Sequence, residues 1–373
     1  MFWNKKNKDV SAASTQENDT MQNLTNSTNN SADAKASNTQ IDFLAIGDTV
    51  TDAFIKLSDN NSWIEDDNAE KTKELCMNFG DKLPYDDVKV IKGVGNSPNA
   101  ATSAHRLGLR SAILTHVGDD DFGKEQVAAF NEEGLNTDNV VVHKDMDSNY
   151  HYVLRRGPER TILVKHTEFP YDFEKDFPAS HPAPKAIYLS SLAENSLDYH
   201  QQIAKYAAEH PETKLIFQPG TFQMSLGKDV LSEIYAHTHI FFCNKEEAQK
   251  ILDTTTDEIK ELLSGIRKLG PKLAVITDGP NGAYVDDGTE VWWGPMYPDP
   301  SNPIDRTGAG DSFASTFTSA LLLGKTPAEA LQWGPINSMS VVQFIGAQEG
   351  LLSRAKLEEY LANAPEDYVA KKL

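Results

Sequence analysis

Short runs of apolar residues alternate with longer amphipathic segments along most of the chain. The short runs end in glycine or polar residues, which predicts buried strands in IDFLAIG (41–47), SAILTHVG (111–118), NVVVH (139–143), KAIYLS (185–190), KLIFQP (214–219), HIFFC (239–243) and KLAVITDG (272–279). Helical spacing of the apolar residues predicts helices over 96–107, 122–134, 198–209, 226–235, 245–252 and 256–268, and again at the end of the chain. This order predicts an α/β fold with a largely parallel sheet covered by helices on both faces.

Three further segments have the pattern of strands outside that parallel series. YHYVLRRGPERTILVKH (150–166) alternates apolar and polar residues around a Gly-Pro turn, which predicts a hairpin with one open face. TDAFIKL (51–57) is typical of a more exposed strand with mixed faces. AYVDDGTEVWWG (283–294) holds an Asp-Gly turn between two short strands. The first two segments together predict a small accessory sheet.

The first forty residues differ from the rest. They are rich in Asn, Ser and Thr, have almost no apolar periodicity, and lack the apolar core of a signal peptide. We therefore expect a disordered tail over residues 1–40 and one large α/β domain over residues 41–373.

Composition narrows the class of protein. The chain has 373 residues and a formal net charge of −20, which argues against nonspecific binding to nucleic acid or to anionic membranes. Two cysteines are too few for a disulfide framework and suggest a reducing compartment, and no apolar run is long enough for a transmembrane helix. We expect a cytoplasmic protein with neither nucleic acid nor a membrane as partner.

The stretch DRTGAGDSF (305–313) carries the clearest chemistry. Gly308, Ala309 and Gly310 precede a predicted helix, and backbone N–H groups at a helix start favour anions. Asp311 follows directly and could accept a proton from an attacking hydroxyl beside a bound phosphate, as a general base does. The alternative is an ordinary helix cap, which stabilises a helix by about 1 kcal/mol.

Three other motifs resemble a P-loop, a dinucleotide-binding loop and a zinc site, but each lacks a residue that the motif requires. The Gly-Lys-Thr at 324–326 lacks the earlier glycine of a P-loop, because position 319 is serine. The dinucleotide fingerprint G-x-G-x-x-G needs a third glycine three residues after the second. The pairs Gly308/Gly310 and Gly93/Gly95 lack it, because Phe313 and Pro98 stand there. His237 and His239 alternate faces without a nearby Cys or Glu to complete a zinc set, so we interpret them as structural or surface residues.

Two signatures resemble those of the ribokinase-like (PfkB-type) carbohydrate and nucleoside kinases. Residues 305–313 match the C-terminal signature D-T-x-G-A-G-D-x-F, except that Arg306 replaces the usual threonine. The N-terminal signature matches VGNSPNAATSAHRLGLRSAILTHVG through Gly95, Asn99, Ala101, Gly108 and Gly118, with Val94 where the first glycine of a pair usually stands. The resemblance covers roughly residues 42–362.

This resemblance implies a doubly wound α/β domain with a small β-sheet lid, built from about 48–58, 86–93 and 148–167. It implies transfer of the γ-phosphate of ATP to a hydroxyl, with Asp311 as general base and Gly308, Ala309 and Gly310 as the anion hole. Magnesium would be held mostly through water, and the sequence leaves a potassium requirement open.

Further site residues follow from the resemblance alone. Asp52, Gly95 and Asn99 match the residues that bind the substrate hydroxyls. Asn244, Thr277, Gly279 and Asn337 match those that border the nucleotide, and Glu247 matches the one associated with magnesium. Capping roles for Asp52 and Asn99, and a solvated surface position for Glu247, remain alternatives.

The sequence leaves three functions open. An ATP-dependent sugar kinase comes first, a nucleoside kinase of the adenosine type second, and a catalytically silent sugar- or nucleotide-binding relative third. The small-molecule acceptor itself is not specified. Arg155 and Arg156 could clamp a phosphorylated sugar or be ordinary hairpin residues, and the role of Arg306 is open. An exposed lid face predicts a homodimer.

Overall fold

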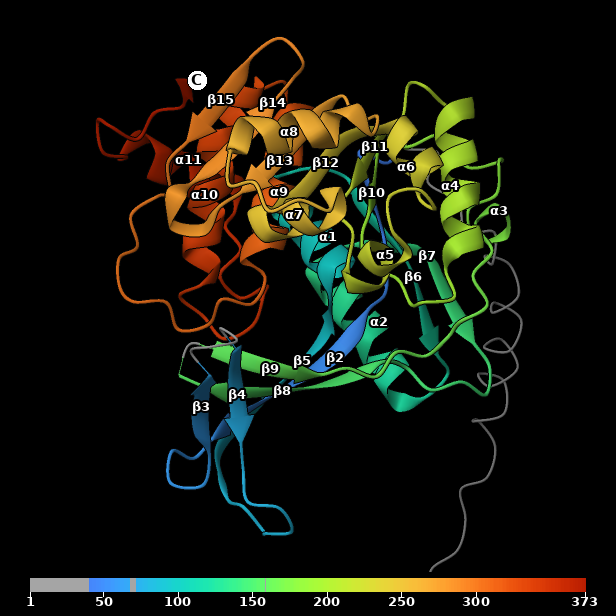
Figure 1. Cartoon of the computed structure of the whole chain (residues 1–373). Coiled ribbons are helices and arrows are strands. Elements are labelled where there is room, and N and C mark those ends of the chain that lie inside the picture. Colours follow the sequence, from blue (N-terminus) through green and yellow to red (C-terminus); the bar gives the residue numbers. More distant parts are fainter. Residues whose placement is uncertain (1–39, 68–71, 158) are drawn as a thin grey trace, which may run out of the picture. The chain divides into compact units, whose positions relative to one another are not determined.

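The computed structural model describes residues 40–67, 72–157 and 159–373 (Figure 1). The tail predicted over residues 1–40 lies outside the described residues except for Gln40. Within the described ranges, every helix is too short or too polar to cross a membrane.

A ten-stranded sheet forms the centre of the domain, in the order β16-β15-β14-β13-β12-β11-β10-β1-β6-β7. Neighbours from β13 to β7 pair in parallel, as the alternating pattern predicts, while β14, β15 and β16 add an antiparallel edge. The bounds of the strands are β1 (Phe43–Ile46), β6 (Ser111–Gly118), β7 (Asn136–His143), β10 (Ala186–Leu189), β11 (Lys214–Phe217), β12 (Thr238–Asn244), β13 (Leu273–Thr277), β14 (Ala283–Asp286), β15 (Val291–Gly294) and β16 (Lys371–Lys372).

Helices cover both faces of this sheet, because successive side chains of its apolar strands point to opposite faces. Phe43 and Ala45 face a core shared with α1, α9 and α10, whereas Leu44 and Ile46 face a second core shared with α4, α6, α7 and α8. The bounds of the helices are α1 (Asn96–Arg106), α2 (Asp121–Glu133), α3 (Phe173–Asp176), α4 (Leu197–Glu209), α5 (Thr221–Leu226), α6 (Ser232–His237), α7 (Lys245–Leu252), α8 (Ile259–Lys268), α9 (Ala309–Leu322), α10 (Pro327–Val341) and α11 (Arg354–Ala362), with a 3₁₀ turn at Gly279–Asn281.

A separate small sheet has the order β5-β2-β8-β9, with bounds β5 (Tyr85–Val94), β2 (Val50–Leu57), β8 (Tyr150–Arg156) and β9 (Glu159–Leu163). Its outer pairs are antiparallel, and β2 and β8 pair in parallel. The predicted hairpin is therefore confirmed as β8 and β9, and the predicted strand after Gly47 is β2. We call this four-stranded unit the small sheet.

Two local expectations differ from the structure, and one hairpin was not expected at all. The first five residues of β2 are buried, so this strand is less exposed than predicted. The helix predicted over 226–235 is wrong, since Gly227 ends α5 with φ +84° and α6 begins afresh at Ser232. A further hairpin of β3 (Trp63–Asp67) and β4 (Thr72–Cys76) was not predicted, because its mostly polar residues carry no clear alternation.

The chain turns in opposite directions on the two sides of β1. From β1 it passes through the small sheet and α1 to β6 and β7, and it then returns to β10 on the other side and continues to β13. Ligands of open α/β sheets bind at such a switch point, outside the carboxyl ends of the strands. The small sheet follows the carboxyl end of β1 directly, which places it beside this edge (Figure 1).

Candidate active site

A cavity of about 550 Å³ lies between the small sheet and the carboxyl edge of the large sheet. Residues of the small sheet, the segment after β1, the start of α1 and the start of α9 line it together. Among the predicted site residues, the cavity lining includes Asp52, Gly95, Asn99, Glu247, Gly308, Ala309, Gly310 and Asp311. Folding thus brings residues from both sequence signatures into one space.

Asp311 lies in the first turn of α9 and is held by side-chain amides from two other segments. Its Oδ1 accepts hydrogen bonds from Asn96 Nδ2 at 2.7 Å and from Gln218 Nε2 at 3.3 Å, and its Oδ2 accepts one from Asn99 Nδ2 at 2.9 Å. The hydroxyl of the buried Tyr188 in turn donates to Gln218 Oε1. Burial raises the pKa of Tyr188 well above its ordinary value, so the phenol stays protonated and remains a donor. Three amide donors therefore fix the orientation of the Asp311 carboxylate at the wall of the cavity.

The turn before α9 has the geometry of an anion site. Gly308 caps the helix with φ +81°, and a Cβ there would overlap Ala347. Asp305 is fully buried and holds the turn, since its Oδ1 accepts from Thr307 N at 3.1 Å and its Oδ2 from Gly346 N at 2.9 Å. The first N–H groups of a helix have no carbonyl partner within it. The N–H of Ala309 donates back to Arg306 O at 3.4 Å, so the next N–H groups of α9, those of Gly310 and Asp311, are the ones that face phosphate oxygens most freely.

The predicted acceptor residues line the same cavity as this turn. Gly95 has φ +120°, and a Cβ there would meet the carbonyl oxygen of Asp48 at 2.8 Å. Asp52 is buried, and its Oδ1 has no hydrogen-bond partner among the described residues although His151 Nδ1 lies 3.5 Å away. Asn99 lies inside α1, whose N-cap is Gly95, so it does not cap the helix. Asp52 thus has an acceptor oxygen free for a ligand.

Asn244 and Glu247 form a reciprocal cap at the start of α7. The Asn244 Oδ1 accepts from Glu247 N at 2.8 Å, and Glu247 Oε2 accepts from Asn244 N at 2.8 Å. Glu247 also lines the cavity, and burial raises the pKa of its carboxyl group, with nearby Asp311 adding to the shift. A carboxylate oxygen beside an anion turn fits a water-mediated magnesium ion, which prefers oxygen ligands and keeps part of its hydration.

The remaining predicted nucleotide residues do not line this cavity. Thr277 ends β13 directly beside Asn244 of β12, and Gly279 follows it in the 3₁₀ turn with φ +48°. Asn337 is fully buried in α10, where its amide donates to Thr316 Oγ1 at 2.8 Å and its Oδ1 accepts from Leu352 N at 2.9 Å. The structure therefore brings Asn337 into the core and not to the cavity.

Of the four arginines near the small sheet, two bind other parts of the chain and two line the cavity. Arg155 is buried and donates to Ile304 O at 3.0 Å, and Arg156 donates to Ser62 Oγ at 2.8 Å, which accounts for both side chains structurally. Arg160 and Arg306 line the cavity instead, and Arg306 lies 3.5 Å from Glu159.

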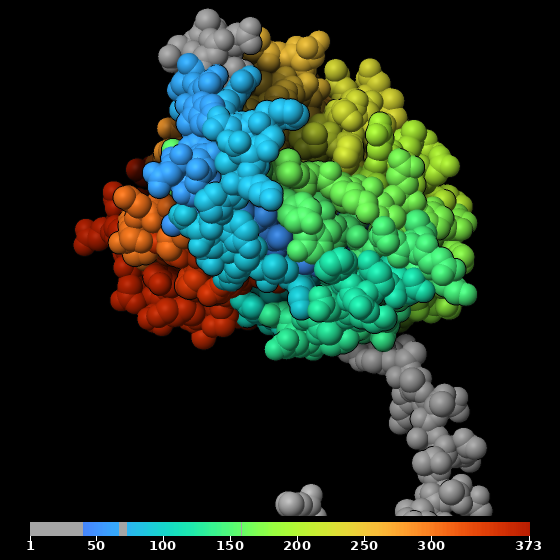
Figure 2. All heavy atoms as spheres, turned by 90° about the horizontal axis from the view of Figure 1, so that it is seen from below, coloured from blue at the N-terminus to red at the C-terminus, as the bar shows by residue number. Residues whose placement is uncertain are grey.

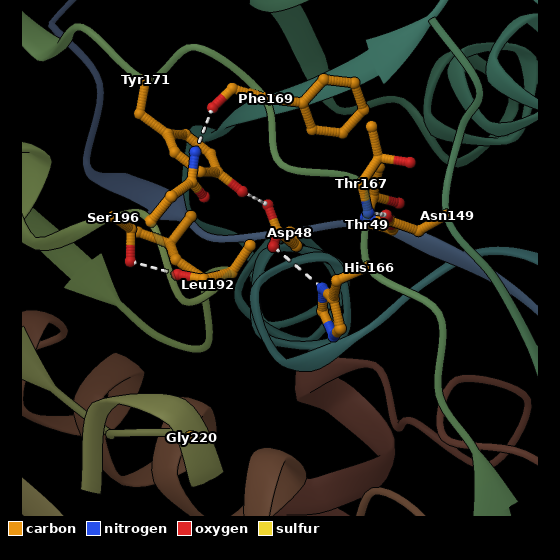
Figure 3. A network of polar contacts seen from close by, with 12 residues as sticks. Asp48, Thr49, Asn149, His166, Thr167, Phe169, Tyr171, Leu192, Ser196 and Gly220 are labelled. Carbon is orange, nitrogen blue, oxygen red and sulfur yellow. Dashed lines mark hydrogen bonds and ion pairs between the residues drawn. The ribbon is translucent and has the colours of Figure 1, made fainter. Parts of the chain in front are cut away.

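Sequence reasoning missed several polar residues of the site, five of which make contacts that matter below. They are Asp48, Asn96, His151, His166 and Gln218. Gln218 directly follows β11, and Asp48 comes two residues after the end of β1. The switch-point rule, applied to every strand end, could therefore have found both. The histidines carry no comparable signal, since their shared position depends on how the small sheet packs. Figure 3 shows His166 and Asp48 side by side, with Tyr171 on the other side of Asp48.

Comparisons with known proteins agree with this geometry. The family model described as "pfkB family carbohydrate kinase" matches residues 88–354. A ribokinase from Bacillus subtilis (strain 168) is 28% identical over 274 residues, which covers 72% of this chain and 87% of the relative. A nucleoside kinase from Methanothermobacter thermautotrophicus is 26% identical over 258 residues, which covers 69% of this chain and 79% of the relative.

Solved structures show the same fold. The crystal structure of a Methanocaldococcus jannaschii nucleoside kinase, described as an archaeal member of the ribokinase family, superimposes with a TM-score of 0.69 at 19% identity. The match covers 86% of this chain and 98% of that one. The chain belongs to the pfkB family of carbohydrate kinases, phosphotransferases that use an alcohol group as acceptor.

Proposed function

We propose that the protein is an ATP-dependent kinase that transfers the γ-phosphate to a hydroxyl of a sugar or sugar derivative, with Asp311 as general base. The observation that carries this proposal is the position of Asp311. Its carboxylate lies beside the anion turn Gly308–Gly310 and faces the same cavity as Asp52 and Asn99.

Different residues of the site would bind the acceptor, take its proton and stabilise the transferring phosphoryl group. Asp52 would accept a hydrogen bond from one acceptor hydroxyl and fix its orientation, and Asp311 would take the proton from the hydroxyl that attacks. The N–H groups at the start of α9 would stabilise the negative charge on the transferring phosphoryl group. Asn96, Asn99 and Gln218 would keep the Asp311 carboxylate aimed at the attacking oxygen.

The cofactors fit residues at the carboxyl edge of the large sheet. ATP would supply the phosphoryl group, and Mg²⁺ would neutralise charge on its phosphates. Asn244 and Thr277 lie side by side at the ends of β12 and β13, where they could border the nucleotide, and Glu247 could hold the metal through water. Asn337 is fully buried in the core, so we do not assign it to the nucleotide site.

The small sheet would act as a lid. Ile162 and Val164 line the cavity from its side, and apolar side chains there would exclude water that competes as phosphoryl acceptor.

The direct test is release of ADP from ATP and magnesium with a panel of pentoses, hexoses, sugar phosphates and nucleosides. We expect one acceptor class to stimulate turnover in the wild type. Asp311→Asn should lower kcat by about 10²–10⁴-fold, because general-base catalysis contributes that much, while ATP binding is largely kept.

Asp198→Asn is the matched control, since Asp198 is an exposed aspartate in the first turn of α4. It should leave kcat unchanged. Activity of Asp311→Asn within a few-fold of wild type would exclude the general-base role.

A nucleoside kinase is the second candidate, favoured by the 26% identical nucleoside kinase. Stimulation by nucleosides and not by free sugars would select it. ATP binding without turnover across the whole panel would instead indicate a silent binding protein.

A further inference from the structure

Two aspartate–histidine pairs lie side by side where the small sheet joins the large one. His166 Nδ1 lies 3.2 Å from Asp48 Oδ2, and His151 Nδ1 lies 3.5 Å from Asp52 Oδ1. The two imidazole centroids are 5.3 Å apart, and all four side chains line the cavity. The kinase chemistry described above uses only Asp52 of these four residues, so the histidines need a separate explanation.

Asp48 is fixed from several sides. Tyr171 Oη donates to Asp48 Oδ1 at 2.7 Å (Figure 3). The Asp48 backbone N–H donates to Ser191 O at 2.9 Å. Burial, followed by the charge of Asp48, raises the pKa of Tyr171 far above its ordinary value. The phenol is therefore a permanent donor, and the second oxygen of Asp48 is left for His166.

The segment that carries His166 is anchored as well. Thr167 N donates to Asn149 Oδ1 at 2.7 Å, and Asn149 Nδ2 donates to Thr49 O at 3.0 Å. Asn149 is almost fully buried. The residues after β1, before β8 and after β9 are thus tied together, which holds the His166 imidazole in one place.

This arrangement selects one form of the His166 ring. An ionised carboxylate only accepts hydrogen bonds, so the Nδ1 that faces Asp48 carries the proton. A neutral imidazole then keeps a lone pair on Nε2. Within the described ranges, the hydrogen bond of His166 uses Nδ1 alone, and its other ring nitrogen is turned away from Asp48 (Figure 3).

The neighbouring pair offers matching groups. Asp52 Oδ1 and His151 Nε2 are buried and have no hydrogen-bond partner among the described residues. Buried polar groups of native proteins are nearly always paired, so unpaired ones that line a cavity indicate a polar ligand. This end of the cavity is therefore suited to a ligand with several hydroxyl groups.

We propose that His166 binds the acceptor, with Nε2 accepting a hydrogen bond from an acceptor hydroxyl, and that Asp48 and Tyr171 are positioning residues for it. The inference rests on the proposed kinase function and narrows its acceptor. An ionised phosphate or carboxylate has no proton to donate to Nε2. The part of the acceptor at this subsite is therefore an uncharged, hydroxyl-bearing group.

The ring form can be measured without any acceptor. Nitrogen-15 NMR of the full chain, with His166→Gln to assign the signal, should show that the neutral form of the ring carries its proton on Nδ1. Tyr171→Phe should weaken this preference, because Asp48 loses the donor that orients it. A neutral form that carries its proton on Nε2 would overturn the proposal.

The binding role is tested by kinetics with the acceptor that the wild type phosphorylates best. His166→Ala should raise the acceptor KM by about 10-fold, the effect of one lost hydrogen bond to a well-oriented group, while kcat and the ATP KM change little. Tyr171→Phe should shift the same KM by less. The control is His210→Ala, because His210 Nδ1 also lies 3.2 Å from a carboxylate oxygen, that of Glu212, outside the cavity.

Failure of this inference can be distinguished from failure of the proposed function. A wild type that phosphorylates no acceptor would refute both. Wild-type turnover with an unchanged acceptor KM in His166→Ala would refute only the role of His166. Should His166→Ala fail to fold, His166→Phe gives the same comparison, because it keeps the volume of the ring and offers no acceptor nitrogen.

Discussion

Asp311 illustrates how one residue can satisfy a capping pattern without serving as the cap. The N-cap of α9 is Gly308, and the Asp311 oxygens accept from Asn96, Asn99 and Gln218. The capping interpretation that the sequence left open therefore fails for Asp311. Asn244 and Glu247, by contrast, do cap a helix, because each accepts a hydrogen bond from the backbone N–H of the other at the start of α7.

A residue-scale prediction concerns His239 in β12. Burial, with Lys214 and Lys272 nearby, lowers the His239 pKa from 6.5 to about 4. The unfolded chain therefore binds more protons than the folded one between these values, so the contribution of this residue to the free energy of unfolding falls as the pH drops from 6.5 toward 4.

Chemical denaturation at several pH values measures this effect. The pH dependence in that interval should be shallower in His239→Gln than in the wild type. Equal slopes in the two proteins would contradict the prediction.

At the scale of elements, the parallel strands and most helices could be predicted because their apolar periodicity is strong and local. The split between α5 and α6, the β3–β4 hairpin and the burial of β2 could not, because they depend on Gly227 in a left-handed conformation or on packing between distant segments. The site divides in the same way. Residues within the two signatures could be predicted, whereas His151 and His166 meet only through the packing of the small sheet.

The two ends of α9 allow a matched test of the anion turn. Gly308 and Gly324 flank the helix with φ +81° and +87°, but a Cβ would overlap Ala347 only at Gly308 and has open space at Gly324. Gly324→Ala should cost about 1–2 kcal/mol for the left-handed backbone alone.

Gly308→Ala should cost more than Gly324→Ala, because steric overlap in a packed site adds about 1–3 kcal/mol, and it should also weaken ATP binding. Thermal unfolding and ATP titration measure the two effects. Equal losses of stability, with ATP affinity kept in both variants, would show that the turn tolerates a side chain.

At the scale of the whole domain, the small sheet has an apolar face of its own. Cross-strand partners place Val90, Ala53, Tyr152 and Leu163 in one row, and three of these side chains are exposed. Figure 2 views the side on which residues 50–67 and 72–95, in blue to cyan, lie next to green segments of the chain. A row of exposed apolar residues on a sheet is typical of an interface.

We therefore expect a homodimer through the small sheet. Light scattering should give twice the chain mass for the wild type, and Val90→Glu should shift the protein toward monomer because it places a charge in the apolar row. A monomeric wild type at working concentration would rule out this interface.

Transfer of phosphate to an acceptor hydroxyl can be followed directly by phosphorus-31 NMR of the reaction products. With ATP, magnesium and the stimulating acceptor, the wild type should form ADP and a new phosphate ester in equal amounts, and Asp311→Asn should form neither at a comparable rate. ADP accompanied only by inorganic phosphate, or an ester formed equally fast by Asp311→Asn, would contradict the account.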